Sequence, residues 1–222
     1  MTESTVYVVD DDARVREAMQ DLLAASGFNV VVFGSAAEYV ANGPGNGSPS
    51  CLVLDIELPD INGLELQRQL SGGEHPPIVF ITGHGDIPSS VRAMKAGAVD
   101  FLPKPFTEEQ LLGAISVALE QHRQTRKDQV ELSELRKRFA SLTPRERDVV
   151  PLIVSGLLNK QAAGELGISE VTLQIHRGRV MRKMEADSLA DLVRMSIKLG
   201  AGDAATGNGA VAEPQSGHDE TI

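Results

Sequence analysis

Near its N-terminus the sequence reads Val6-Tyr7-Val8-Val9-Asp10-Asp11-Asp12, an apolar run that ends in three carboxylates. β-branched and aromatic residues of this kind favour strands. Four further apolar runs follow, at residues 30–33, 51–54, 78–81 and 99–102, with amphipathic stretches between them. Near-continuous apolar strands are typical of a parallel sheet that is covered on both faces. The alternation predicts an α/β fold, with a doubly wound sheet of five strand–helix units.

Three of the stretches between the runs have helical spacing. In the first, Val15 and Met19 lie on one face, and Gly27 follows as a C-cap. The second covers residues 64–70, and the third ends at Gly97. Doubly wound folds bind their ligands at the carboxyl ends of the strands. Candidate functional residues are therefore those that directly follow the apolar runs.

Carboxylates follow two of these runs. Asp10 and Asp11 come after the first strand, and Asp55 and Glu57 come after the third. The first and third strands are neighbours in a doubly wound sheet, so these like charges would cluster. Clustering is unfavourable unless a cation lies among them, and hard oxygen ligands suit Mg²⁺. Asp12, the third carboxylate after the first run, can be explained as a helix N-cap alone.

A hydroxyl and an ammonium group follow the fourth and fifth strands at this edge. Thr82 ends the fourth run, and Lys104 follows the fifth. A carboxylate beside a metal ion can attack phosphorus, and these two groups can bind the phosphate that results. A Lys before a Pro is by itself most often a surface loop residue. The ordered set after four strands is what indicates phosphoryl transfer.

The set resembles the receiver signature of two-component response regulators over about residues 4–120. The matching motifs are Val9-Asp10-Asp11, Leu54-Asp55, Ile81-Thr82-Gly83 and Lys104-Pro105-Phe106. The resemblance implies that Asp55 accepts a phosphoryl group from a sensor histidine kinase. It also implies Mg²⁺ ligands at Asp10, Asp11, Asp55 and the backbone carbonyl of Glu57, and a cis bond between Lys104 and Pro105. Thr82 and Phe101 would respond to the phosphate as a switch, beside Lys104.

A long helix is predicted from about Thr107, whose capping-box partner is Gln110. Its last part carries an apolar stripe with 3-4-3 spacing, formed by Leu132, Leu135, Phe139 and Leu142. Such a stripe is typical of a coiled coil. A dimer seam and a linker helix packed on its own domain are equally good explanations of it.

Four shorter helices are predicted after the long one. They are a helix that starts at the capping box Thr143-Pro144-Arg145-Glu146, a helix over 160–166 that ends at Gly167, a helix from Ser169 to about Met184, and a helix over 189–199 that ends at Gly200. In the third, Val171, Ile175 and Met181 lie on one apolar side. A short helix, a turn and a basic helix match a helix-turn-helix.

Residues 141–200 resemble the LuxR-type domain of NarL/FixJ regulators through Leu142-Thr143-Pro144-Arg145-Glu146-Arg147, Ile168-Ser169, Val171-Thr172 and Met181-Arg182-Lys183-Met184. The resemblance implies base contacts by Gln174, Ile175 and Gly178. It implies contacts to the backbone of double-stranded DNA by Lys160, Thr172, Arg177, Arg179, Arg182 and Lys183. It also implies a dimer seam formed by Leu189, Leu192 and Val193.

Three residues depart from a regular LuxR-type domain. Gly178 and Gly164 each weaken a helix by up to about 1 kcal/mol. Pro151 lies inside the first helix of the domain, where a proline can cost about 3 kcal/mol and kinks the chain. A loosely folded or weakly binding DNA domain would follow from these residues.

The net charge is −10, but the acidic residues are concentrated in two segments. Residues 1–120 contain 6 Lys/Arg and 17 Asp/Glu, and residues 201–222 contain no Lys/Arg and 4 Asp/Glu. Residues 121–140 hold 6 against 3, and residues 141–200 hold 9 against 7. The mildly basic region 141–200 is therefore able to meet DNA. We expect a receiver domain (1–120), a helical linker (121–140), a helix-turn-helix domain (141–200) and a disordered tail (201–222).

No apolar run approaches the ~18 residues that span a bilayer, and the N-terminus has neither the basic residues nor the apolar core of a secretory signal. The single cysteine, Cys51, cannot form an internal disulfide. We therefore expect a cytoplasmic protein without membrane contact, with Cys51 buried in a strand.

The leading hypothesis is a phosphorylation-switched transcription factor and not an enzyme, apart from self-phosphorylation and self-dephosphorylation at Asp55. Phosphorylation would pair two chains on a two-fold operator, with RNA polymerase as a further partner. One alternative is an aspartyl phosphatase, but that class needs Asp-x-Asp, and Asp55-Ile56-Glu57 ends in Glu. Another alternative is a phosphate-responsive partner-binding or phosphate-sink module with weak DNA binding.

Overall fold

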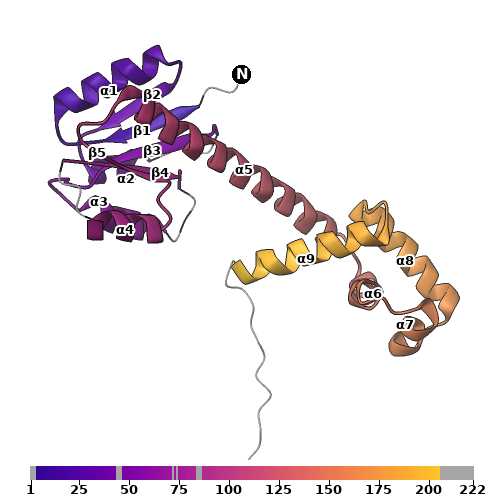
Figure 1. Cartoon of the computed structure of the whole chain (residues 1–222). Helices are drawn as coiled ribbons and strands as arrows, with labels where there is room; N and C mark the ends of the chain where they lie inside the picture. The colour runs from indigo at the N-terminus through magenta and orange to yellow at the C-terminus, as the bar shows by residue number, and fades with distance from the viewer. Residues whose placement is uncertain (1–3, 44–46, 72, 74, 84–86, 206–222) are drawn as a thin grey trace, which may run out of the picture. The chain divides into compact units, whose positions relative to one another are not determined.

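The computed structural model describes residues 4–43, 47–71, 73, 75–83 and 87–205. In the first half, five strands form one sheet (Figure 1). They are β1 (Thr5–Val9), β2 (Asn29–Phe33), β3 (Ser50–Asp55), β4 (Ile78–Thr82) and β5 (Asp100–Pro103). The order is β2-β1-β3-β4-β5, and all neighbours are parallel. The predicted doubly wound sheet is confirmed, and its strands lie where the apolar runs predict them.

Helices cover both faces of the sheet (Figure 1). They are α1 (Ala13–Ala25), α2 (Ala36–Asn42), α3 (Gly63–Leu70), α4 (Ile87–Lys95) and the first part of α5 (Glu108–Ala140). α1 and α5 pack on one face, and α2, α3 and α4 pack on the other. Val6 and Val8 of β1 enter the first core, whereas Tyr7 and Val9 enter the second. This alternation explains why β1 is apolar from Val6 to Val9.

Local residues determine where these helices begin and end. The Asp12 carboxylate caps α1 by accepting a hydrogen bond from the backbone N–H of Arg14, the role that the sequence allowed for it. Gly27 and Gly97 follow α1 and α4 with φ of +86° and +89°, a conformation that glycine adopts without strain. Helix α2, which Ser35 caps, has no counterpart among the three predicted helical stretches, because seven residues give too few turns for a clear pattern.

Helix α5 is continuous, and two compact units share it. The chain divides between Lys127 and Asp128, inside the predicted linker 121–140. The first part of α5 belongs to the sheet unit, where Nδ1 of His122 accepts a hydrogen bond from the Ser50 backbone N–H at 2.8 Å. The predicted linker is therefore not a separate segment, because each of its two parts packs on one of the units.

The apolar stripe at the end of α5 packs on the C-terminal unit. Leu135 and Leu142 are buried in the core of this unit, and Leu132 and Phe139 pack against it. Of the two explanations that the spacing left open, the structure shows packing on the stripe's own domain.

The described part of the C-terminal unit contains four further helices. They are α6 (Pro144–Val154), α7 (Asn159–Leu166), α8 (Glu170–Met184) and α9 (Leu189–Ala205). The predicted capping box at the start of α6 is present, with hydrogen bonds in both directions between Thr143 and Glu146. Gly167 ends α7 with a φ of +63°. The predicted helices over 160–166 and from Ser169 to Met184 are thus confirmed to within one residue at each boundary.

Helix α9 continues past Gly200 to Ala205, so the predicted end at Gly200 is wrong. Residues 201–205, expected to belong to a disordered tail, are helical. A glycine inside a helix costs only about 1 kcal/mol, and Gly200 does not have the positive φ of Gly27 or Gly97. The rest of the predicted tail, residues 206–222, lies outside the described residues.

Helix α6 runs through Pro151 and ends at Val154. Pro151 has no N–H to donate to the preceding turn, but its own carbonyl accepts a hydrogen bond from the Ser155 N–H at 3.1 Å. The proline therefore removes one hydrogen bond close to the end of α6 and does not terminate the helix.

Candidate functional site

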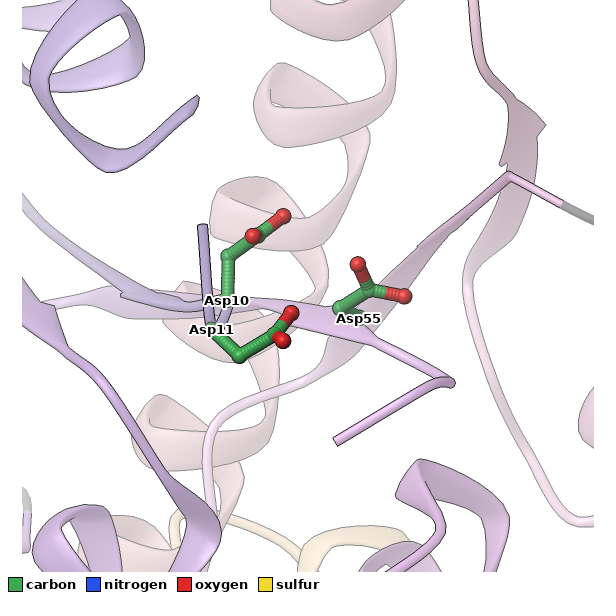
Figure 2. A group of neighbouring side chains, drawn as sticks. All are labelled: Asp10, Asp11 and Asp55. Atoms are coloured by element: carbon green, nitrogen blue, oxygen red, sulfur yellow. The ribbon is translucent and has the colours of Figure 1, made fainter. Parts of the chain in front are cut away.

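Three carboxylates meet at the carboxyl edge of the sheet. Asp10 and Asp11 follow β1, and Asp55 ends β3, the neighbour of β1. Their carboxylate oxygens lie within 4.8 Å of one another, and Figure 2 shows them facing a common space. The structure thus brings together the acidic residues that the sequence predicted. Three carboxylates at this separation form a donor set that fits Mg²⁺.

Lys104 counters the charge of the two buried carboxylates. Its Nζ donates hydrogen bonds to Oδ2 of Asp10 at 2.7 Å and to Oδ2 of Asp55 at 2.6 Å. Burial raises the pKa of Asp10, and the charge of Asp55 adds to this, while the hydrogen bond and charge of Lys104 act against it. Burial lowers the pKa of Lys104, but its bonds to the two carboxylates outweigh burial and leave that pKa raised.

Backbone N–H groups orient the same carboxylates. Oδ1 of Asp10 accepts a hydrogen bond from the N–H of Asp12 at 2.9 Å, and Oδ1 of Asp55 accepts one from the N–H of Glu57 at 3.0 Å. The second bond brings Glu57 next to the acidic cluster through its backbone. With one oxygen held by the backbone and the other by Lys104, each buried carboxylate has a defined orientation.

The strand ends carry the two other predicted residues to the same edge. Thr82 is buried at the end of β4, and Ile81 beside it pairs with Asp55. The Thr82 carbonyl accepts a hydrogen bond from the Lys104 N–H at 2.7 Å. The bond between Lys104 and Pro105 is cis, as the receiver resemblance implies. Phe101 lies on β5, half-buried against the core beneath α2, α3 and α4.

Two residues that contact the site were missed by the sequence analysis. A Cβ added to Gly63 would lie 2.5 Å from the Asp55 carbonyl oxygen, so only glycine allows α3 to start this close to β3. The sequence feature that could have indicated Gly63 is its position directly after Asn62, the N-cap of α3. Arg16 donates a hydrogen bond from Nη1 to the Asp10 carbonyl at 2.6 Å, for which the sequence offered no signal beyond its place on α1.

The second candidate region is helix α8, whose buried face differs from the predicted one. Its buried residues are Leu173, Val180 and Met184. Val171 and Ile175 are 68% and 51% exposed, so their predicted place on an apolar side shared with Met181 is wrong. Spacings of seven and four residues put the buried residues on one side of a helix, and Val171 and Ile175 fall on the opposite side.

Most of the predicted DNA-binding residues are accessible. The exposed ones are Lys160, Gln174, Ile175, Gly178, Arg179 and Arg182, and the partly buried ones are Thr172, Arg177 and Lys183. Nη1 of Arg177 bonds to Oδ1 of Asn159 at 2.9 Å, which ties α8 to α7. The hydroxyl of Thr172 bonds to that of Ser169 at 2.8 Å. These two side chains thus have partners inside the domain.

Lys183 also has an internal partner. Its Nζ donates to Oε2 of the buried Glu146 at 2.6 Å, and the N–H of Thr143 donates to the same oxygen at 2.8 Å. The bonds from Lys183 and Thr143 lower the pKa of Glu146 to about 2. Because this pair links α8 to the start of α6, Lys183 positions the helix in addition to any contact with DNA.

The predicted dimer seam on α9 needs one correction. Leu192 is fully buried in the core of the C-terminal unit, so its side chain is not available to a second chain. Leu189 is exposed, Val193 is partly buried, and Ile197 on the same helix is largely exposed. Helical spacing alone did not distinguish the inward residue from its neighbours.

Comparisons with known proteins match both halves of the chain. Residues 6–116 match the family described as response regulator receiver domain, and residues 140–196 match bacterial regulatory proteins of the luxR family. Nodulation protein W of Bradyrhizobium diazoefficiens is 50% identical over 200 residues, which cover 90% of this chain and 88% of that protein. Transcriptional regulatory protein FixJ of the same species is 41% identical, and the match covers 90% of this chain and 97% of FixJ.

The chain belongs to the NarL/FixJ response regulators. Response regulator protein TodT of Pseudomonas putida is 47% identical, with 88% of this chain and 86% of TodT covered. Among solved structures, response regulator StyR is 48% identical with a TM-score of 0.77, and the match covers 88% of this chain and 99% of StyR. Full-length FixJ from B. japonicum is 40% identical with a TM-score of 0.54, with 90% and 99% covered.

This response regulator therefore combines a receiver domain with a LuxR-type DNA-binding domain, and its function is phosphorylation-dependent regulation of transcription. The family consists of transcriptional regulators, so the aspartyl phosphatase alternative is set aside. Among the described helices, none is both long and apolar enough to cross a membrane.

Proposed function

We propose that Asp55 is the phosphoryl acceptor of this response regulator and that a sensor histidine kinase is the donor. The observation that carries the proposal is the environment of Asp55, which lies beside the acidic cluster with one oxygen bonded to a backbone N–H and the other to Lys104. Asp10 is fully buried, which limits the access of a phosphoryl donor to its carboxylate. Asp11 is exposed and has no comparable orienting bonds among those described.

The transfer is a displacement at phosphorus. A carboxylate oxygen of Asp55 attacks the phosphorus of a phosphohistidine, the N–P bond breaks as the O–P bond forms, and the imidazole keeps the electron pair and takes up a proton. Mg²⁺ held by Asp10, Asp11, Asp55 and the Glu57 carbonyl would supply positive charge against that of the phosphoryl oxygens. Lys104 then exchanges its bond to the Asp55 carboxylate for one to a phosphoryl oxygen.

The switch residues are Thr82 and Phe101. Thr82 ends β4 at the same edge as Asp55, so its hydroxyl can turn toward a phosphate. Phe101 is only half-buried, so a turn inward behind Thr82 would bury its ring further. Crystals of the receiver with and without a phosphate mimic test this step, and an unchanged Phe101 rotamer would count against it.

Phosphorylation leads to a homodimer. The outer face of α4 supports this proposal, because Ile87, Val91 and Met94 recur at helical spacing and are all exposed. On α9, Leu189 and Val193 remain candidates for a second contact, without Leu192. A two-fold pair of receivers brings two LuxR-type domains to the two halves of an operator. RNA polymerase is the further partner, and the cytoplasm is the compartment where these partners meet.

DNA is contacted through α7 and α8. Lys160, Arg179 and Arg182 are exposed and suited to phosphates, as are Thr172, Arg177 and Lys183 when their internal bonds allow it. Gln174, Ile175 and Gly178 face the bases, where Gln can pair with adenine.

The test is DNA binding at fixed salt, because phosphate contacts make affinity depend strongly on salt. The full chain, with and without beryllofluoride and Mg²⁺, is combined with genomic fragments while the mass in solution is followed. A dimer with a specific footprint supports the proposal. A dimer without any footprint supports a phosphate-responsive partner-binding or phosphate-sink module instead.

Asp55→Asn and Asp12→Asn form a matched pair for the acceptor itself. Asp12 lies in the same acidic motif but caps α1, and Asn caps a helix as well as Asp does. Labelling by phosphoramidate should be lost in Asp55→Asn and kept in Asp12→Asn. Continued labelling of Asp55→Asn would overturn the assignment.

A further inference from the structure

Helix α8 exposes two large apolar side chains next to each other. Val171 and Ile175 are 68% and 51% exposed, and they lie one helical turn apart. They stand opposite Leu173 and Val180, which are fully buried in the core of the domain. Two adjacent exposed aliphatic side chains on this face are available for contact with another molecule.

The surroundings of this pair are open and basic. The other exposed residues of the same face are Gln174, Gly178, Arg179 and Arg182. A Cβ added to Gly178 would meet no atom within 4 Å, so nothing among the described residues covers the middle of this face. A glycine at this point also lets a partner approach the helix axis closely. Val171 and Ile175 have short side chains and can contact a partner only at such a close approach.

The arginines favour a polyanion over an apolar protein surface as the occupant. Arg179 and Arg182 flank the apolar pair, and both are exposed. Duplex DNA supplies phosphates for the arginines, and its major groove also offers an apolar group, the C5-methyl of thymine. Val171 lies in the first turn of α8, and the first residues of a recognition helix are those that reach base edges.

We propose that Val171 and Ile175 form a methyl-reading pair that makes the operator preference of this protein depend on thymines. The proposal rests on the proposed DNA-binding function and adds Val171 to the base-facing residues. The two residues are separated by about 6 Å along the helix, and successive bases by about 3.4 Å, so the two thymines lie within about two base-pair steps. Removal of one methyl contact should weaken binding about fourfold per half-site.

The experiment starts from random duplexes selected with the full chain in the presence of beryllofluoride and Mg²⁺ at fixed salt. Wild type, Val171→Ala, Ile175→Ala and the control Val130→Ala are compared. Val130 is a valine of α5 in the same unit that is 64% exposed, and it lies off α8. We expect the duplexes selected by wild type and by Val130→Ala to share a preferred thymine. Val171→Ala should no longer prefer thymine at that position.

Deoxyuridine then replaces that thymine, which removes only the methyl group. Wild type should lose about fourfold in affinity per half-site, and Val171→Ala should be indifferent to the exchange. Equal losses in both would overturn the proposal, as would a solution mass that drops in Val171→Ala, because the pair would then be a protein contact. If wild type enriches no duplex, the proposed DNA binding itself fails, and the inference fails with it.

Alanine at either position is expected to leave the fold intact, because both side chains are exposed and Ala is the better helix former. Far-UV circular dichroism and thermal unfolding of each variant confirm this before binding is measured.

Discussion

Replacement of Lys104 by methionine tests whether the acidic site depends on one internal cation. Lys104 Nζ lies 2.7 Å and 2.6 Å from oxygens of Asp10 and Asp55. Methionine keeps much of the length of the side chain and removes its charge. The variant therefore leaves two carboxylates, both buried, facing each other without the ammonium group between them.

The size of the effect follows from the geometry. The carboxylate oxygens lie within 4.8 Å of one another, and two unit charges at that limit repel each other by about 3.5 kcal/mol at an effective dielectric of about 20. Removal of one partner from a fully buried pair costs about 3–5 kcal/mol, but the Lys104 side chain is 25% exposed, which lowers that cost. We expect the receiver domain to lose about 2–3 kcal/mol of its free energy of unfolding at neutral pH without metal.

The pH dependence has a defined sign. Burial already raises the pKa of Asp10, and Lys104 opposes this, so the variant should raise that pKa further. A carboxyl group with a raised folded-state pKa gives stability that is present below its ordinary pKa of 3.8 and is lost as the pH rises through the folded-state value. The deficit of the variant should therefore be small in acid and grow toward neutral pH.

The assay is urea unfolding followed by tyrosine fluorescence. Both tyrosines of the chain, Tyr7 and Tyr39, lie in the receiver core, so the signal reports this domain alone. Lys95→Met, at an exposed lysine of α4, is the matched control and should change stability by less than about 1 kcal/mol. Mg²⁺ should recover most of the loss in Lys104→Met, because it supplies the missing charge and binds only the folded site.

Equal stability of Lys104→Met and wild type in a chelator would refute the reasoning. A deficit that Mg²⁺ does not reduce would also refute it, because the loss would then come from packing and not from charge.

Four further predictions concern single positions. The pKa of Glu146 is about 2 in the folded state, so its charge stabilises the DNA-binding domain above the ordinary pKa of 4.5, and this stability is lost as the pH falls toward 2. Glu146→Gln should lower the free energy of unfolding by about 1–2 kcal/mol at neutral pH. It should also make stability, followed by far-UV circular dichroism, less dependent on pH between 4.5 and 2. Gly164→Ala should stabilise α7 by about 0.5–1 kcal/mol in thermal unfolding, because its Cβ meets nothing within 4 Å. Gly167→Ala, at a φ of +63°, should destabilise by about 1 kcal/mol, and a gain there would contradict the strain argument. Gly63→Ala should slow phosphoramidate labelling by at least about tenfold, because its Cβ would displace the Asp55 backbone; unchanged labelling with unchanged stability would show that the loop yields freely.

The sequence alone was sufficient for the sheet and for the acidic cluster. Five apolar runs specify five parallel strands, and a parallel sheet brings the residues that follow its strands to one edge. The sequence alone therefore predicts that Asp10, Asp55 and Lys104 lie together. Helix boundaries at Thr143 and Gly167 were also predictable, because caps are local interactions between residues a few positions apart.

Only the tertiary structure decided which side of a helix faces inward and which charged groups pair. Val171 and Ile175 have the composition of a core face, yet the buried side of α8 follows Leu173 and Val180, because the packing of α6 and α7 determines it. The pairing of Lys183 with Glu146 joins residues 37 positions apart, and Gly63 matters because α3 starts against the Asp55 carbonyl. Such contacts depend on how whole elements pack, and no periodicity or spacing along the chain encodes them.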